Sequence, residues 1–268
     1  MSNKILLVLF LSLLVSCGSS TKKNIKDNLS DVENVFNYTD KNGQFTVRAS
    51  SGFNEKTKSF VSKRSMEVRG GGKEKILEQS VAISALGVVG KNKVPVLRPK
   101  ISQYNVWFDG KKYSSELKLN PAKKAIDVKM VSPESQWSGT KQIKFPSSTM
   151  IPCFFSQIID CAKINGFIKK TSASKKGSMR FLIVWEGYPY LNETFTDFPS
   201  DLFSEAVLEY DGITKEGERR FNLRVLGQSI FYVLDTNDSM SKMFWVSQGI
   251  SMVNKNAKQV SSQDGEDF

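Results

Sequence analysis

The stretch "YNVWFDGKKYSSELKLNPAKKAIDVKM", residues 104–130, decides the fold. Apolar and polar residues alternate on both sides of Asp109-Gly110, a dipeptide typical of tight hairpin turns. A second turn signal at residues 120–124 leads into residues 125–130, which have the same alternation. A period of two residues is the spacing of a strand whose two faces differ. The stretch therefore predicts an antiparallel meander with one buried face and one wet face.

The same pattern, or a short apolar run, recurs along the chain. It predicts further strands at residues 45–47, 179–185, 221–225, 230–234, 243–246 and 250–253. Helical signal is scarce: residues 152–162 and a segment near 29–38, which starts with a capping-box pattern, predict short helices, and residues 80–89 are ambiguous. The expected fold class is mainly β: a curved antiparallel sheet, either an open half-barrel or two layers, with a few short helices.

The N-terminus has the pattern of an export signal. Lys4 supplies a positive charge, and residues 5–15 form an apolar run that is shorter than the roughly 20 residues of a membrane span. The run ends on "LVSC", residues 14–17, which resembles the lipobox of bacterial lipoproteins. That resemblance implies cleavage before Cys17, a diacylglycerol on its thiol and an acyl chain on its new amine. Gly18 after the cysteine implies the outer membrane, facing the periplasm.

The expected organisation follows from this anchor. We predict a cleaved signal peptide at residues 1–16, a lipid-anchored tether at 17–40, a β-rich domain at 41–260 and a flexible tail at 261–268. A sub-boundary near residues 146–151 leaves one domain or two open. The alternative for the N-terminus is an ordinary export signal in which the cysteine has no role.

The net charge of the chain limits the classes of binding partner that we expect. The formal net charge is +11, and removal of the signal peptide, whose only charged residue is Lys4, leaves +10. A basic exported protein favours anionic partners. We therefore expect contact with the membrane through the lipid anchor, and with a lipid, lipopolysaccharide or another envelope protein, but not with nucleic acid.

Composition also narrows the chemistry. The chain contains no His, which excludes His-dependent catalytic triads and most transition-metal sites, so we expect neither a metal nor any cofactor besides the lipid on Cys17. Cys153 and Cys161 are eight residues apart. They are expected to form a disulfide, because the envelope is oxidising; two buried thiols are the alternative.

A long loop is the candidate ligand site. The segment "WEGYPYLNETFTDFPSDLF", residues 185–203, is expected at the rim of the sheet, where long irregular loops are often functional. Glu186 and Glu193 form a candidate carboxylate pair of the glycosidase kind. The alternative is a solvated loop whose acids attract the lysines of residues 163–180. Candidate contacts to a sugar face or an apolar ligand are its aromatic residues Trp185, Tyr188, Tyr190, Phe195 and Phe198.

Weaker patterns do not point to an enzyme. Residues 235–238 offer carboxylates for calcium but lack the Gly and distal Glu of an EF-hand loop. Residues 172–175 match Ser-x-x-Lys, a pattern that starts at six positions in this chain and has little information. Residues 69–75 lack phosphate-loop spacing and predict a hairpin loop. Trp137 is expected to be exposed.

The last strands suggest a class of fold. The run "KMFWVSQGISMV", residues 242–253, is similar to the curved-sheet half-barrels of envelope lipoprotein carriers, and this similarity implies a concave face that binds acyl chains. The leading hypothesis is a non-catalytic binding protein for a hydrophobic ligand or an envelope polymer. One alternative is a structural or assembly lipoprotein that docks another envelope protein. The other is a hydrolase that uses carboxylates of the 185–203 loop.

Overall fold

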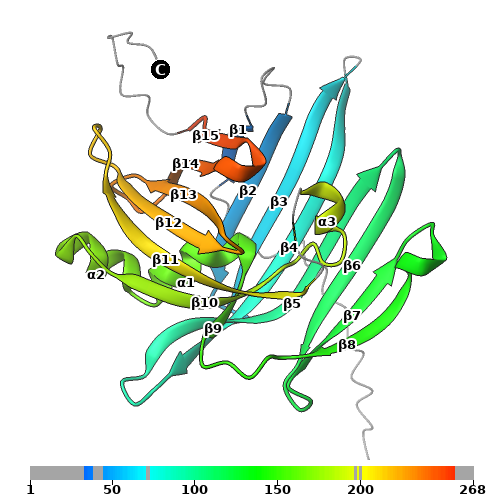
Figure 1. Cartoon of the computed structure of the whole chain (residues 1–268), viewed down its shortest axis with the longest axis horizontal. Helices are drawn as coiled ribbons and strands as arrows, with labels where there is room; N and C mark the ends of the chain where they lie inside the picture. The colour runs from blue at the N-terminus through cyan, green and yellow to red at the C-terminus, as the bar shows by residue number, and fades with distance from the viewer. Residues whose placement is uncertain (1–32, 39–44, 71–72, 196–197, 199–200, 257–268) are drawn as a thin grey trace, which may run out of the picture.

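The computed structural model describes residues 33–38, 45–70, 73–195, 198 and 201–256 (Figure 1). They form one sheet of fifteen strands and three short α-helices. The strands are β1 (Glu33–Tyr38), β2 (Phe45–Asn54), β3 (Ser59–Gly70), β4 (Lys73–Val89), β5 (Val94–Phe108), β6 (Lys111–Asn120), β7 (Ala125–Val131), β8 (Gly139–Lys144), β9 (Ile151–Phe154), β10 (Ser178–Val184), β11 (Phe203–Ile213), β12 (Arg219–Val225), β13 (Gln228–Leu234), β14 (Met240–Trp245) and β15 (Ile250–Asn254). The helices are α1 (Ile158–Ile164), α2 (Phe167–Ser174) and α3 (Leu191–Thr194).

The first and last described strands, β1 and β15, pair with each other in the middle of the sheet. The strand order runs from β8 through β1, then from β15 to β9, and Phe36 of β1 lies opposite Asn254 of β15. Strands β9 and β10 are parallel, and all other pairs are antiparallel. Strands β8 and β9 are the two edges, so the sheet is curved but not closed (Figure 1). The expectation of a mainly β, curved antiparallel sheet is confirmed.

The meander predicted from residues 104–130 corresponds to β5, β6 and β7. Tyr104, Leu117 and Val128 are buried, and each lies two residues from another buried residue of its strand. Asp109 and Gly110 have φ angles of +48° and +77°, the backbone that a two-residue hairpin turn requires. Alternation therefore predicted both the strands and their buried faces here.

The strands β10 to β15 present one kind of inner face, which we call the apolar wall. Helices α1 and α2 lie against it, and wall and helices share one buried cluster (Figure 1). Burial of large apolar side chains is the main stabilising contribution to such a core. The wall includes Phe181, Ile183, Leu208, Phe221, Leu223, Ile230, Leu234 and Trp245, and the helices contribute Ile158, Ala162, Phe167 and Ile168.

The strands β3 to β6 present a different inner face, which we call the polar wall. Its buried residues include many small or polar side chains, which leave room for other parts of the chain to approach closely. They are Ser62, Glu78, Ser80, Ser84, Ser102, Tyr104 and Ser115.

Two segments of the chain, residues 155–157 and 185–191, fill the space between the walls. From the first segment, Gln157 is fully buried and bonds to Ser62 and Ser84 of the polar wall. From the second, the Tyr190 hydroxyl donates toward the Ser114 and Trp137 carbonyls, 3.3 and 3.1 Å away. The open apolar concave face that we expected is therefore occupied by the protein itself.

The predicted helices and the predicted tether agree with the structure only in part. Residues 33–38 form β1, so the predicted helix near 29–38 is wrong over those residues, and the tether predicted to reach residue 40 overlaps a strand of the sheet. Residues 152–162 begin in β9, and the helix α1 starts only at Ile158. The ambiguous residues 80–89 lie in β4. The predicted signal peptide, Cys17 and the tail at 261–268 lie outside the described residues.

The possible boundary near residues 146–151 lies between the two edge strands. The chain leaves β8 there and starts β9 at the opposite edge of the same sheet. All described strands on both sides of this crossing therefore belong to one sheet. None of the helices in the described part of the chain has the length and apolar content that a membrane crossing needs.

Candidate functional site

A small pocket lies where the polar wall meets the two filling segments, and we call it the central pocket. Its volume is about 30 Å³, enough for roughly two water molecules. The lining comes from β3, β4, β5 and β14, from residues 155–156 and from the 185–195 segment. It comprises Arg64, Glu78, Ser80, Tyr104, Phe155, Ser156, Trp185, Glu186, Gly187, Leu191, Phe195 and Trp245.

An ion pair forms part of the pocket. The Nη1 atom of Arg64 lies 3.4 Å from Oε1 of Glu78, whose side chain is only 5% exposed. Strand alternation places both residues on the inner face, because β3 and β4 are antiparallel neighbours. The buried Nε of Arg64 has no hydrogen-bond partner among the described residues. A donor is therefore free beside a carboxylate that is already charge-compensated.

Tyr104 contributes a second group without a partner. Its side chain is buried, and within the described part of the chain its hydroxyl makes no hydrogen bond of ordinary geometry. Burial raises the pKa of Tyr104 well above its usual value, and the nearby Glu78 carboxylate adds to the effect. The hydroxyl therefore stays protonated, and it can donate and accept hydrogen bonds. A buried, unpaired hydroxyl is costly, which makes this position a candidate ligand contact.

Glu186 supplies a second carboxylate. It is buried, and its Oε1 accepts a hydrogen bond of 2.9 Å from the backbone N–H of Ser156. Burial raises the pKa of the Glu186 carboxyl, and the hydrogen bonds from Ser156 offset part of that rise. The pocket thus combines donors and acceptors within one desolvated space.

The other side of the pocket is aromatic. The ring centroids of Phe155 and Trp185 are 4.7 Å apart, and those of Phe195 and Trp245 are 4.9 Å apart. Phe155 also lies 5.8 Å from Trp245, so the four rings form a continuous surface. Aromatic faces of this kind pack against apolar surfaces of a ligand while polar groups fix its orientation.

The structure places the aromatic residues of the predicted ligand loop against the inner face of the sheet rather than at its rim. Trp185 and Phe195 line the central pocket. Tyr188 packs in a cluster between the walls, and Tyr190 packs edge-on against Tyr113. Phe198 is buried and packs against Trp185. The rim position is therefore wrong, because these large apolar surfaces are buried against the chain itself.

The predicted carboxylate pair is not brought together in the pocket. Glu193 is exposed on α3 and does not line the pocket, whereas Glu186 does. The carboxylate that shares the pocket with Glu186 is Glu78. Trp137, expected to be exposed, is half-buried and packs on Tyr190, 6.2 Å between ring centroids.

The cysteine pair is bonded in the structure. The sulfur atoms of Cys153 and Cys161 are 1.95 Å apart, which joins the end of β9 to α1. Cys17, the predicted lipidation site, lies outside the described residues.

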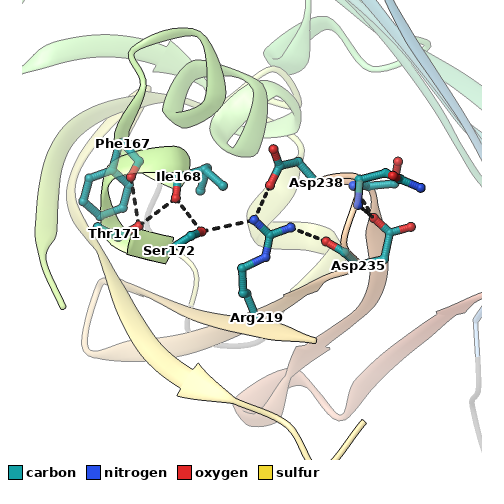
Figure 2. Close-up of polar contacts among 9 residues, drawn as sticks. Phe167, Ile168, Thr171, Ser172, Arg219, Asp235 and Asp238 are labelled. Atoms are coloured by element: carbon teal, nitrogen blue, oxygen red, sulfur yellow. Dashed lines mark hydrogen bonds and ion pairs between the residues drawn. The ribbon is translucent and has the colours of Figure 1, made fainter. Parts of the chain in front are cut away.

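The candidate calcium ligands have other partners, as Figure 2 shows. The Oδ1 of Asp235 accepts hydrogen bonds from the backbone N–H groups of Asn237 and Ser239, both 2.8 Å long. Asp238 pairs with Arg219 at 2.5 Å, and Arg219 also donates to the Asp235 carbonyl. Within the described ranges, no cluster of three or more metal-ligating side chains occurs. These contacts fasten the turn between β13 and β14.

The Ser-x-x-Lys pattern is likewise structural. Ser172 donates to the Ile168 carbonyl, 2.7 Å away, and accepts from Arg219 at 3.1 Å (Figure 2). Lys175 is exposed in a left-handed conformation at the end of α2. Arg219 therefore connects α2 to the turn between β13 and β14.

Sequence reasoning missed Arg64, Glu78 and Tyr104. The available signal was the spacing of Glu78, Ser80 and Ser84, which puts polar residues at alternate positions of a strand. That pattern normally indicates a solvent-facing side, and only the position of the 155–157 and 185–191 segments turns it into a buried one.

Comparison with known proteins gives little. No family model matches the chain, and no curated protein matches its sequence. The fold is similar, with a TM-score of 0.41 and 11% sequence identity, to the crystal structure of a beta-barrel-like protein of a domain of unknown function (DUF1849) from Brucella abortus. That similarity covers 83% of this chain and 93% of the other.

Proposed function

We propose that this protein is a lipid-anchored, non-catalytic binding protein of the bacterial envelope. Its ligand is a hydroxyl-rich unit of an envelope polymer, such as a sugar residue. One observation carries the proposal, and it concerns two polar groups that are buried at the central pocket. The Arg64 Nε has no partner among the described residues, and the Tyr104 hydroxyl, which lies beside Glu78 and Thr194, makes no hydrogen bond of ordinary geometry with them. A ligand that satisfies them would recover the free energy that the unliganded site forgoes.

The chemistry of the pocket favours hydroxyl groups. A hydroxyl both donates and accepts, so neighbouring hydroxyls of one sugar can take a bond from Arg64 or Tyr104 and give one to Glu78 or Glu186. The apolar face of the ring would lie on the aromatic side, formed by Trp245 and its neighbours. The pocket, about 30 Å³ in volume, admits the polar groups alone, so the ring itself would sit at its opening.

The same dimensions argue against an acyl chain. The hydrophobic-carrier hypothesis needs an open apolar face, and the filling segments bury that face themselves. Three ionisable residues, Arg64, Glu78 and Glu186, also line the pocket. An apolar ligand would remove them from water and would offer no hydrogen bonds in return.

Binding to the pocket is tested with the tetramer of N-acetylglucosamine and with palmitate, by isothermal titration and tryptophan fluorescence. We expect the tetramer to bind and Tyr104→Phe to weaken it roughly three- to tenfold, the value of one hydrogen bond. The same variant should unfold at an unchanged or higher temperature, because it removes a buried group without a partner. Tyr210→Phe is the matched control, since Tyr210 packs on Phe221 outside the pocket.

Two results would contradict this function. Binding of palmitate but not of the tetramer would favour the hypothesis of a hydrophobic ligand instead. Binding of neither, with one envelope protein retained stoichiometrically by the purified chain, would favour the assembly lipoprotein instead.

A second candidate is a carbohydrate hydrolase. Glu78 and Glu186 line one pocket, and burial raises the pKa of Glu186, as a general acid requires. We place binding first, because Glu78 is paired with Arg64 and Glu186 already accepts a hydrogen bond from Ser156. Prolonged incubation with the tetramer separates the two: intact sugar supports binding, whereas cleavage that Glu186→Gln abolishes supports hydrolysis.

The anchor is tested separately. The intact mass of the protein from envelope membranes should include the lipid that the "LVSC" motif predicts on Cys17. Cys17→Ser should carry no such mass. Wild-type protein without any lipid would refute the anchor and leave the pocket proposal untouched.

A further inference from the structure

Three turns at one end of the sheet carry an excess of positive charge, and we call them the basic rim. Residues 55–58 join β2 to β3, residues 90–93 join β4 to β5, and residues 121–124 join β6 to β7. These twelve residues contain one acid, Glu55, and six exposed lysines. The lysines are Lys56, Lys58, Lys91, Lys93, Lys123 and Lys124.

Topology places the three turns together. Strands β2 to β7 form an antiparallel meander, so every second turn lies at the same end of the sheet. The described turns at the opposite end, residues 109–110 and 132–138, contain Asp109 and Glu134 and no basic residue. Exposed Lys111 and Lys112 follow the 109–110 turn directly, so the opposite end also carries positive charge. The lysines that lie within the described turns are nevertheless all at one end of this wall.

The ends of β4 and β5, next to the middle turn of the basic rim, also expose apolar side chains. The β4–β5 hairpin extends beyond β3, whose first residue, Ser59, lies opposite Ala85 (Figure 1). On this extension Leu86 is 45% exposed and Val88 is 52% exposed, and Pro95, opposite Val88, is exposed as well. Apolar residues flanked by lysines fit the boundary between lipid headgroups and acyl chains.

The described chain begins near the same end. In the β1–β2 pair, Glu33 lies opposite Ser50 and Tyr38 opposite Phe45, so β1 starts toward the end where β2 enters the 55–58 turn. Cys17 precedes Glu33 by sixteen residues, which span at most about 55 Å. A lipid on Cys17 would therefore hold this end of the sheet within reach of the bilayer.

We propose that the basic rim is a second membrane contact, which rests on the surface of a bilayer that contains anionic lipid. Lysines at such a surface are attracted by the negative headgroups, and each contributes a modest increment that adds along the rim. The exposed tip of the β4–β5 hairpin enters the headgroup region between them. The argument from the chain's start depends on the proposed lipid anchor, but the contact itself is tested without it.

The test uses residues 22–268, which lack Cys17 and keep every described strand. Co-sedimentation is measured with vesicles of phosphatidylcholine alone and with vesicles that also contain phosphatidylglycerol. We expect binding to the anionic vesicles only, and loss of that binding at high salt. Binding to both kinds of vesicle, or to neither, would overturn the proposal.

Matched variants locate the contact. Replacing Lys91, Lys93, Lys123 and Lys124 by Gln should weaken vesicle binding roughly tenfold or more. Replacing four exposed lysines of the α2 region by Gln makes the same change in charge and should alter it less than about twofold. These control positions are Lys169, Lys170, Lys175 and Lys176.

Further readouts separate this proposal from its alternatives. Equal loss in both variants would mean attraction by net charge and would overturn a localised contact. Stronger binding to soluble polyphosphate than to anionic vesicles would indicate that the partner of the basic rim is an acidic polymer and not a membrane. Thermal unfolding should be unchanged in both variants, because all the substituted lysines are exposed. Sugar binding by the rim variant, and vesicle binding by Tyr104→Phe, should stay at wild-type levels, so the two proposals fail independently.

Discussion

The apolar wall and the polar wall belong to one sheet and alternate with the same period, yet they bury opposite kinds of side chain. The apolar wall packs Phe221 and its neighbours against α1 and α2. The polar wall turns Glu78 and Tyr104 toward a small pocket, and some of its polar atoms lack partners among the described residues. One wall therefore carries most of the stability, and the other holds groups that a stability-optimised core would exclude.

The largest effect should come from breaking the apolar wall. Phe221 is fully buried and contacts the rings of Phe167 and Tyr210. Phe221→Ala should lower the free energy of unfolding by about 3–5 kcal/mol, because it removes apolar contacts and leaves a cavity. Urea unfolding measures this. Phe231→Ala, on the half-buried opposite face of the next strand, should cost far less, and equal losses would contradict the assignment of the core.

A half-buried acid beside the apolar wall, Asp160, should make stability depend on pH. Burial raises the pKa of Asp160 to about 6, and Lys163, 3.9 Å away, offsets part of this rise. The unfolded pKa is near 3.9, so the folded state holds the extra proton between about pH 4 and 6. Stability is therefore greatest below this window and falls as pH rises through it, by up to about 3 kcal/mol.

Urea unfolding at pH 4.5 and pH 7 tests this linkage. Asp160→Asn should remove most of the decrease, since Asn does not titrate. The raised pKa of Glu186 acts with the same sign and is common to both proteins. Parallel pH profiles for wild type and variant would show that Asp160 is not the source.

An intermediate effect should come from the satisfied part of the polar wall. Gln157 accepts a hydrogen bond from Ser84, 2.5 Å away, and donates to Ser62 and to the Ala82 carbonyl, both 3.1 Å away. Gln157→Ala leaves these buried groups without their hydrogen-bond partner and should lower the free energy of unfolding by about 2 kcal/mol. Gln142→Ala, on the exposed edge strand β8, should cost less than about 0.5 kcal/mol. A neutral Gln157→Ala would mean that the polar wall is hydrated and not packed.

The smallest effect concerns the contact in Figure 2, where α2 is fastened to the apolar wall's far turn. Arg219, only 16% exposed, pairs with Asp238 and bonds to Ser172. Arg219→Met should cost about 1 kcal/mol, because Asp238 can turn to solvent. Hydrogen exchange should increase in α2 and remain unchanged in β10 to β12. Arg220→Met, at a more exposed pair with Asp211, should leave α2 exchange unaffected.

Much of the fold was predictable from local pattern, because strand alternation and turn residues act over a few positions. Residues 104–130 show this most clearly. The segment near 29–38 was mispredicted because Val32 and Phe36 fit a helical spacing, whereas β1 is held by pairing with β2 and β15. Distant pairing overrode the local preference there.

The candidate site was less predictable, for the same physical reason. Trp185 and Phe195 were identified as ligand contacts from their chemistry and do line the central pocket. Arg64, Glu78 and Tyr104 were missed because their burial depends on segments about 50 to 130 residues away along the chain. Alternation shows that two faces differ, but a polar inner face resembles a wet outer one until the segment that covers it is known.

The β1–β15 pair has a consequence for synthesis. Residues 36 and 254 are partners, so at about 5–20 residues per second the first strand waits roughly 10–40 s for its neighbour to be made. Throughout that interval one edge of β1 offers unpaired backbone groups, which are a template for pairing with any other extended chain. A copy that stops before residue 250 keeps that edge of β1 open, and only the synthesis of β15 supplies the strand that covers it.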